Sequence, residues 1–512
     1  MTGGSASSSN RWAVLAVLSG ALAVISLDNT IVNVALPTLQ EDLDATTSQL
    51  QWVVDAYSVM FAGCLLLAGS LGDRFGRRRM LLIGLVIFAL GSVGAALSTN
   101  ADMLTAWRAV MGVGGAFIMP STLSLLVHVF QERTERAQAI GIWAAVAGLG
   151  VALGPIVGGV LLEQFSWHAI FWVNPVLVTV GFIAAVILVP ESKDPSRPRL
   201  DLPGAALSAF GLILLVVTII EIPDEGITLL TSSTAIGAVV LLGAFVWWEG
   251  RAPRPILPLS LFKQRLFSAA VVTVGLVYFG LMGAMFFLPQ FLQLVQGLSP
   301  LESGFAVLPG ALGLLVASVA SPRLAERFGT RIIVVIGMAV ATAGIGSFSL
   351  LSVGSSLLVV SGTFAVVGLG LGMVLPQATN AVIASVPEER SGMGSAVNDA
   401  VGELGGSLGV AILGAAMAVT YRLHVEDAIT AAGAAAKAVP AEALDAARES
   451  LAAASLAAGR LPDGVAEQFR AVTSQAFTSG MGWALLLGSV VMGAGAVLAW
   501  LRFPERVDRA EE

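Results

Sequence analysis

Apolar segments long enough to cross a lipid bilayer recur along almost the whole chain, and this pattern constrains the fold more than any other feature. A spanning helix needs about 20 mostly apolar residues, and such segments recur from Trp12 to Trp500. Only 12% of the residues are charged, against roughly 25% in a soluble domain. Because backbone groups in lipid must be paired internally, spans of this length form helices. The sequence therefore predicts an all-α integral membrane protein.

Fourteen segments are predicted to span the membrane. They lie at residues 12–36, 49–70, 80–97, 103–126, 138–161, 169–190, 202–222, 229–248, 266–289, 303–320, 332–351, 357–376, 395–420 and 478–501. The stretch 421–477, between the last two spans, is rich in alanine and has helical periodicity. It is predicted to be an extracellular helical loop that packs over the bundle or is solvated, and a substrate-recruiting lid is the alternative.

The placement of basic residues predicts the orientation. Most of the 27 Lys and Arg residues lie in alternate connections between spans, and the short connections on the other side hold none. Positive residues collect on the cytoplasmic side of a membrane. Both termini are therefore predicted to be cytoplasmic.

Two motifs occur once in each half of the chain. Gly72–Arg78 after the second span is similar to Ala325–Arg331 after the tenth, and the Gly-rich segments before Pro120 and Pro376 are also similar. Paired halves with a site at their interface are typical of secondary transporters. The predicted units are an N-terminal six-helix bundle (1–200), an inserted pair of helices with its linker (201–262) and a C-terminal six-helix bundle (263–512).

Four acidic residues lie inside predicted spans, where a charge is costly and usually functional. They are Asp28, Asp55, Asp399 and Glu403, and the last two are four residues apart on one helix face. Burial favours the neutral form of a carboxyl group, so a proton can compete with a cationic ligand. We predict that Asp28, Asp399 and Glu403, with Arg108, couple transport to protons and that Asp55 contacts substrate. A structural role, paired with Arg108 or capped by the backbone, is the alternative.

Aromatic and thioether side chains can surround an organic cation through cation–π and soft contacts. In addition to Asp55, the predicted substrate-binding residues are Trp52, Tyr278, Met282 and Phe286. Packing against lipid is the structural alternative for most of the side chains in the ninth span.

Two groups of residues are predicted to act in the conformational change. The repeated loop motif combines glycines that allow a sharp turn with charges that can cap or pair. Its candidates are Gly69, Asp73, Arg74, Gly76, Arg77, Glu326 and Arg327. In the fifth span, small residues permit close helix packing and a proline favours a bend. The candidates there are Gly150, Gly154, Pro155, Gly158 and Gly159.

These segments resemble the signatures of a known family. Gly69–Arg79 fits the loop pattern GxLaDrxGrkk, Leu27–Pro37 resembles a first-helix signature, and Gly141–Gly159 resembles the fifth-helix pattern of antiporters. The chain is thus similar to the fourteen-helix drug/proton antiporters of the major facilitator superfamily. Arg108 fits the family's fourth-helix pattern RxxqGxg, but Met111 stands where the family usually has Gln. The acid Asp55, in the pattern WxxDxY, makes this segment similar to that of the exporters of quaternary ammonium compounds.

The resemblance implies a major-facilitator fold and a proton-coupled multidrug exporter of lipophilic or quaternary organic cations. It also implies the inner (plasma) membrane of a bacterial-type cell. Its partners would be small-molecule cations, protons and the lipid bilayer, with no nucleic acid and no obligate protein partner. The proton gradient would drive it without a cofactor. An exporter of a specific endogenous solute, such as an antibiotic, a lipid or a siderophore, would use the same scaffold.

The remaining function classes are disfavoured by composition. With three histidines and one cysteine, Cys64, the chain lacks the ligands for a Cys/His metal cluster. None of its three lysines lies in a P-loop motif, so ATP hydrolysis by such a loop is excluded. A membrane-embedded enzyme or receptor without transport is the rival class, and the two halves with paired loops argue against it.

Overall fold

The computed structural model describes residues 8–193, 201–252, 255, 259–386, 391–432 and 439–505. Within these ranges the regular structure is helical, without a strand. This confirms the predicted all-α class.

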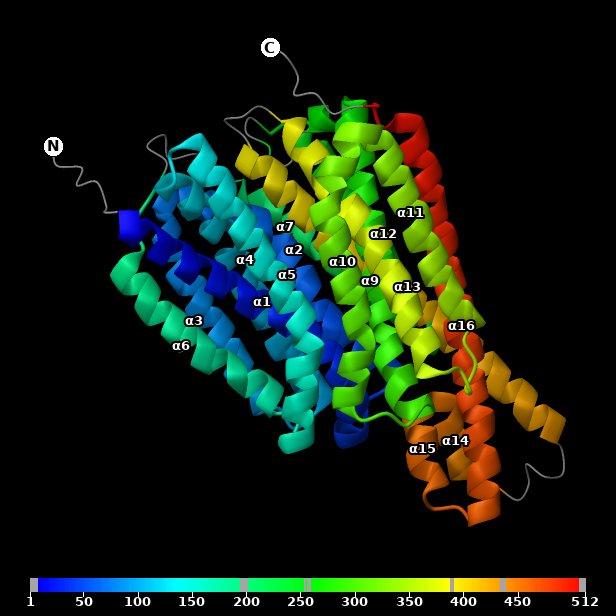
Figure 1. Ribbon diagram of the computed structural model, residues 1–512. Coiled ribbons are helices and arrows are strands. Elements are labelled where there is room, and N and C mark those ends of the chain that lie inside the picture. Colours follow the sequence, from blue (N-terminus) through cyan, green and yellow to red (C-terminus); the bar gives the residue numbers. More distant parts are fainter. Residues whose placement is uncertain are drawn as a thin grey trace.

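The chain forms two groups of long helices that lie side by side (Figure 1). The first, called the N-terminal bundle here, contains α1 (Ser8–Leu43), α2 (Thr47–Phe75), α3 (Arg77–Ala96), α4 (Ala101–Val129), α5 (Arg133–Gln164) and α6 (Ala169–Leu188). The second, called the C-terminal bundle, contains α9 (Arg265–Gln290), α10 (Pro300–Phe328), α11 (Thr330–Ser347), α12 (Leu357–Ala384), α13 (Ser391–Ala432) and α16 (Asp463–Arg502). The domain boundary predicted at residue 200 lies outside the described residues.

Over the part of the chain that the structure describes, twelve helices are long and apolar enough to cross a membrane. Helix α2 would add a thirteenth, but it bends by 47° between Thr47–Leu65 and Leu67–Phe75. In α5 the apolar part, Gly148–Gln164, is shorter than a full span over the described residues. The predicted count of fourteen is therefore not confirmed.

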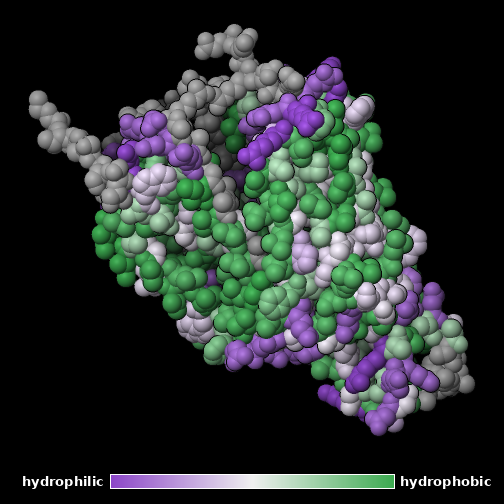
Figure 2. All heavy atoms as spheres, viewed as in Figure 1, coloured by the Kyte–Doolittle hydropathy of each residue, from purple (hydrophilic) through white to green (hydrophobic). Residues whose placement is uncertain are grey.

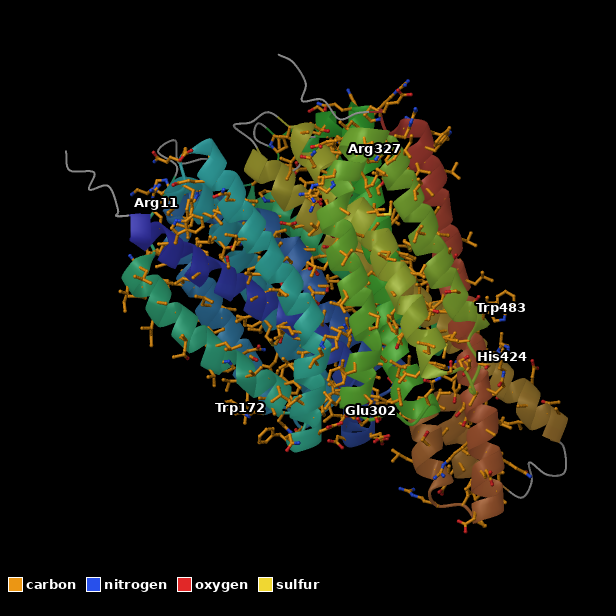
Figure 3. The ribbon with its side chains drawn as sticks, viewed as in Figure 1. Arg11, Trp172, Glu302, Arg327, His424 and Trp483 are labelled. Atoms are coloured by element: carbon orange, nitrogen blue, oxygen red, sulfur yellow. The ribbon has the colours of Figure 1, made fainter. Side chains whose placement is uncertain are left out.

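The two ends of the molecule are polar and its middle is apolar. Figure 2 shows hydrophobic residues around the middle and hydrophilic residues gathered at both ends. Arg11 and Arg327 lie at the end called the terminal face here, because α1 begins and α16 ends there (Figures 1 and 3). Trp172 and Glu302 lie at the opposite face (Figure 3).

Two additional features distinguish the molecule from a simple pair of bundles. Helices α7 (Leu202–Glu225) and α8 (Leu229–Glu249) form a hairpin, and α7 packs against both α2 and α13. The contact is a small apolar cluster of Val59, Val216, Ile220 and Ala411. At the opposite face, α14 (Ala441–Glu449) and α15 (Leu451–Ala458) lie beside extensions of α13 and α16 (Figure 1). We call α14 and α15 the helical cap.

Local sequence signals define several helix ends. Thr46 caps α2 and Ser299 caps α10, each in a capping box with the residue three positions later. Gly76 and Gly329 separate α2 from α3 and α10 from α11, with φ of 122° and 90°. Each glycine N–H donates to the carbonyl four residues earlier. The repeated loop motif thus has the same backbone geometry in both halves, where only glycine is unstrained.

Candidate functional site

A buried ion pair lies in the core of the N-terminal bundle. Arg108 Nη1 of α4 donates to Asp28 Oδ2 of α1 at 2.6 Å, and the two side chains are 1% and 0% exposed. The other carboxylate oxygen, Oδ1, accepts from Asn174 Nδ2 of α6 at 2.7 Å. Both oxygens of Asp28 are therefore bonded, which is what a buried carboxylate requires.

The guanidinium of Arg108 has two further partners on α2. Its Nε donates to the Val53 carbonyl at 3.1 Å, and its Cζ lies 4.4 Å from the centre of the Tyr57 ring. Tyr57 is fully buried. The charge is thus held by a carboxylate, a carbonyl and an aromatic face.

Asn174 extends this network to α3. It also donates to Ser92 Oγ at 3.0 Å, and Ser92 donates to the Phe171 carbonyl at 2.8 Å. Sequence analysis did not select Asn174 or Tyr57. The available signal was an asparagine in the apolar segment 169–190 and an aromatic residue two positions after Asp55.

A second group of acids lies where α2 of one bundle meets α13 of the other. Asp55 is fully buried, and its carboxyl oxygens lack a well-formed hydrogen bond among the described residues. The hydroxyl of Ser407 on α13 is close enough to interact with it. Asp55 therefore lies at the interface between the bundles, without the strong partner that Asp28 has.

The two acids of α13 continue this contact toward the terminal face. Glu403 interacts with the Ser58 hydroxyl of α2 and electrostatically with Arg108 and Asp399. Asp399 accepts from the Asn398 side chain at 3.1 Å. We call Asp55, Ser58, Glu403 and Ser407, with Asp399, the α2–α13 polar seam. It connects the acids of α13 electrostatically with the ion pair of the N-terminal bundle.

The structure places the predicted aromatic and thioether ligands at separate locations. The Trp52 indole donates to Glu221 of α7 at 3.1 Å, so it contacts the inserted hairpin. Tyr278 packs against Gly402 beside the seam. Met282 lines a central cavity, and Phe286 lines a different cavity at the opposite face. Their role in binding substrate remains a prediction.

The central cavity lies between α1, α5, α9, α10 and α12. Its volume is about 90 Å³, below the roughly 300–1,000 Å³ of sites for drug-sized ligands. Its walls are mainly apolar, with a few polar side chains from α1. They include Thr30, Asn33, Pro155, Met282, Met285 and Phe364.

The glycines of α5 allow close contacts with both bundles. A side chain at Gly150, Gly154 or Gly158 would collide with α1, and one at Gly159 would collide with Leu301 of α10. Similarly, a side chain at Gly304 of α10 would meet the Pro155 carbonyl at 2.6 Å. Close packing of α5 on both sides therefore depends on these small residues.

The loop motif of the N-terminal bundle forms a latch with the segment after α6. Arg77 bonds to Asp73 at 2.8 Å, and its backbone N–H donates to the Ser192 carbonyl at 2.8 Å. The Arg78 N–H donates to Glu191 at 3.1 Å. Gly69 faces Pro120 of α4.

The repeat in the C-terminal bundle has a parallel arrangement. Arg331 bonds to Glu505, which follows α16, at 2.7 Å. Arg74 and Arg327 occupy equivalent positions over the rings of Phe75 and Phe328. Sequence analysis missed the acceptors Glu191 and Glu505, although each follows a proline directly after the last helix of its bundle. Glu326 has no specific contact among the described residues.

The family of the chain follows from a comparison with known proteins. The family model of the Major Facilitator Superfamily matches residues 18–410. The chain belongs to this superfamily. Like other members, it is a multi-span membrane transporter and not an enzyme, so the predicted family is confirmed.

Curated relatives match at least four fifths of the chain. The chain is 36% identical over 492 residues to the multidrug efflux pump LfrA of Mycolicibacterium smegmatis. This match covers 95% of each of the two chains. It is 32% identical over 504 residues to the tetracenomycin C resistance and export protein of Streptomyces glaucescens, with 98% and 93% covered. It is 31% identical over 416 residues to the methyl viologen resistance protein SmvA of Salmonella typhimurium, with 81% and 84% covered.

A solved structure supports the fold. A bacterial homologue of the human lysosomal transporter Spinster, in an inward-facing and unoccupied conformation, has a TM-score of 0.66 and 17% identity. The match covers 97% of this chain and 98% of that one. The all-helical major-facilitator fold is thus established.

Proposed function

We propose that the protein is a proton-coupled antiporter that exports lipophilic or quaternary organic cations by alternating access between its two bundles. The observation that carries the proposal is the buried Asp28–Arg108 pair, with the α2–α13 polar seam next to it. Ionisable groups inside the membrane are costly and usually line the path of an ion or proton. Here they lie inside one bundle and at its contact with the other, the part that rearranges in alternating access.

The geometry suggests how protons and cations could exchange. Asp28 is an acceptor for Arg108 and Asn174 in the described state. Protonation of its carboxyl group would remove the charge that holds the guanidinium and free Arg108 to pair elsewhere. Glu403, which already interacts with Arg108 across the bundles, is the acid that could receive it. Asp55, lacking a strong partner, is the acid that a cationic substrate could neutralise.

The contacts between the bundles indicate which side is closed. Toward the opposite face, Glu163 of α5 accepts from Ser299 at 2.5 Å, and Gln293 donates to the Val34 carbonyl at 2.8 Å. Figure 2 shows the surface hollowed between the bundles at the terminal face. If the terminal face is cytoplasmic, as the basic residues predict, this is an inward-facing state.

The proposal includes the finer topology. The bent helix α2 and the helix α5 would complete fourteen spans in the plasma membrane, with both termini cytoplasmic and the helical cap extracellular. The halves would be residues 1–200 and 263–512, with the inserted pair of helices between them. The glycines of α5 and the two latches would act in the switch between states. No cofactor and no obligate protein partner are invoked.

The relatives support export and leave the substrate class open. SmvA is a resistance protein for methyl viologen, which is an organic cation and fits the proposed substrates. The relative that covers 98% of the chain is instead a resistance and export protein for tetracenomycin C. Export of one endogenous antibiotic-like solute is therefore the second candidate.

The test is an efflux assay on the purified full-length protein in proteoliposomes. Ethidium, methyl viologen and tetracenomycin C would be compared with and without an imposed pH gradient. Gradient-driven movement of the two cations supports the proposal, and movement of tetracenomycin C alone supports the second candidate. No gradient-driven movement of either cation contradicts the proposal.

The variant Asp28→Asn tests the coupling residue. It keeps the side-chain volume but cannot take up a proton, so gradient-driven efflux should be lost at equal amounts of folded protein. Asp427→Asn, an exposed aspartate at the extended end of α13, is the matched control and should leave efflux unchanged. Normal driven efflux by Asp28→Asn would show that another group carries the proton.

A further inference from the structure

A larger cavity lies at the opposite face, where residues of both bundles and of the helical cap line it. Its volume is about 460 Å³, within the roughly 300–1,000 Å³ of sites for drug-sized ligands. The central cavity, at about 90 Å³, is below that range. Of these two cavities among the described residues, the one beneath the cap is therefore the one with room for such a molecule. We call it the cap chamber.

The chamber has aromatic walls. Phe286 and Phe287 of α9, Tyr421 of α13 and Phe477 of α16 line it, together with Met417. These side chains are 0–5% exposed, so they form an apolar backing against which an aromatic molecule or an organic cation could pack.

Polar groups are placed among these rings. Gln290 lines the chamber and is only 5% exposed. The Tyr421 hydroxyl is buried without a hydrogen-bond partner among the described residues. A buried hydroxyl without a partner costs stability, and a ligand with a polar substituent could supply the missing partner.

The charges of the roof are largely compensated. Arg448 bonds to Glu426 of α13 and to Asp445 of α14, both at 2.7 Å. The bond to Glu426 also ties the cap to α13. The chamber therefore favours a mostly apolar ligand with a polar group or a delocalised charge over a small, strongly hydrated ion.

The walls of the chamber come from both bundles. Gln40, Thr46 and Thr47 belong to the N-terminal bundle, whereas the aromatic residues belong to the C-terminal bundle. In addition, α15 of the cap contacts α1. Any movement that separates the bundles at this face must change the shape of the chamber, so its occupancy and the transport state are coupled.

We propose that the cap chamber is a second binding site, for flat aromatic amphipathic molecules, and that the exported molecule occupies it on leaving the central cavity. Binding in the chamber stands on the geometry above. The place of the chamber on the export route rests on the proposed function.

The binding test uses a single reactive cysteine in the chamber. Cys64 is replaced by alanine, and Thr47→Cys is labelled with a small maleimide in full-length protein in nanodiscs, with ethidium as the probe. Free ethidium at ten times its Kd leaves about a tenth of the sites open, so labelling should slow about tenfold. Thr430→Cys is the matched control, because Thr430 is exposed on α13 outside the chamber, and its labelling should not change. Unprotected Thr47→Cys, or equal protection of both cysteines, overturns the proposal.

The export test fills the chamber. Ala418→Trp places a large side chain on a wall residue, and Val419→Trp places the same side chain at the next residue, which is 44% exposed. With equal thermal stability, Ala418→Trp should slow ethidium export several-fold and Val419→Trp should not. Equal rates would remove the chamber from the export route.

The two proposals fail in different ways. Protection of Thr47→Cys without gradient-driven export would refute the proposed function and leave the chamber as a binding site. Gradient-driven export without protection would refute the chamber alone.

Discussion

The Asp28–Arg108 pair allows a quantitative prediction, because each partner can be neutralised separately. Two unit charges 2.6 Å apart attract each other by about 6 kcal/mol at an effective dielectric constant of 20. Desolvation offsets much of this, but removing one partner of a buried pair still costs about 3–5 kcal/mol, because the other charge stays buried. The decrease in the free energy of unfolding therefore depends on which of the two charges stays buried without its partner.

The two single substitutions should differ in a definite direction. Asp28→Asn leaves the guanidinium with the Val53 carbonyl and the Tyr57 ring, and arginine cannot lose its proton. We expect it to lower the free energy of unfolding by about 3–5 kcal/mol. Arg108→Gln leaves a carboxyl group that can take up a proton and that keeps Asn174 as a partner. Its cost should be smaller.

The double variant tests the pairing itself. With both charges gone, Asp28→Asn/Arg108→Gln should be more stable than the sum of the single losses predicts, by about 3 kcal/mol. Denaturant unfolding of the four purified proteins in one detergent, followed by tryptophan fluorescence, measures this coupling. Additive losses, or a larger loss for Arg108→Gln, would refute the reasoning, since either result means that the two charges do not stabilise each other as the geometry indicates.

Three further predictions concern transport. Because Asp55 has no strong partner, Asp55→Asn should impair divalent organic cations more than monovalent ones, and equal losses at matched expression would count against Asp55 as a ligand. Asp73 and Arg77 form a latch away from the cavities. The variants Asp73→Asn and Arg77→Ala should therefore slow turnover with little change in ethidium binding to the purified protein. Altered binding with normal turnover would contradict this prediction. If Asp28 and Asp399 each return a proton per monovalent cation, one net charge moves inward, worth about 2.3 kcal/mol per 100 mV. Monovalent export should then persist with nigericin and weaken with valinomycin and potassium, and flux indifferent to an imposed potential at zero pH gradient would exclude the two-proton cycle.

The sequence alone determined the class of the protein and its helical elements. Long apolar segments leave a chain in lipid few alternatives to helices, so the long helices could be located from hydropathy, although the count of fourteen spans is not confirmed. The repeated loop motif also follows from sequence, because the turns at Gly76 and Gly329 need a residue that tolerates a positive φ. The acids inside the spans stood out for the same local reason, since each is a charged residue in an apolar segment.

The tertiary structure decided which of these residues meet. Hydropathy indicates that a segment is a helix but not how the helix is rotated about its axis. The sequence therefore could not show that Asn174 bonds to Asp28 or that Trp52 bonds to Glu221. Met282 and Phe286 lie four residues apart on one helix face but line two different cavities, because the neighbouring helices enclose different spaces at the two depths. The cap chamber was hidden for a further reason. Its walls come from α1, α2, α9, α13, α16 and the cap, and a volume enclosed by segments so distant in the chain exists only once they are packed together.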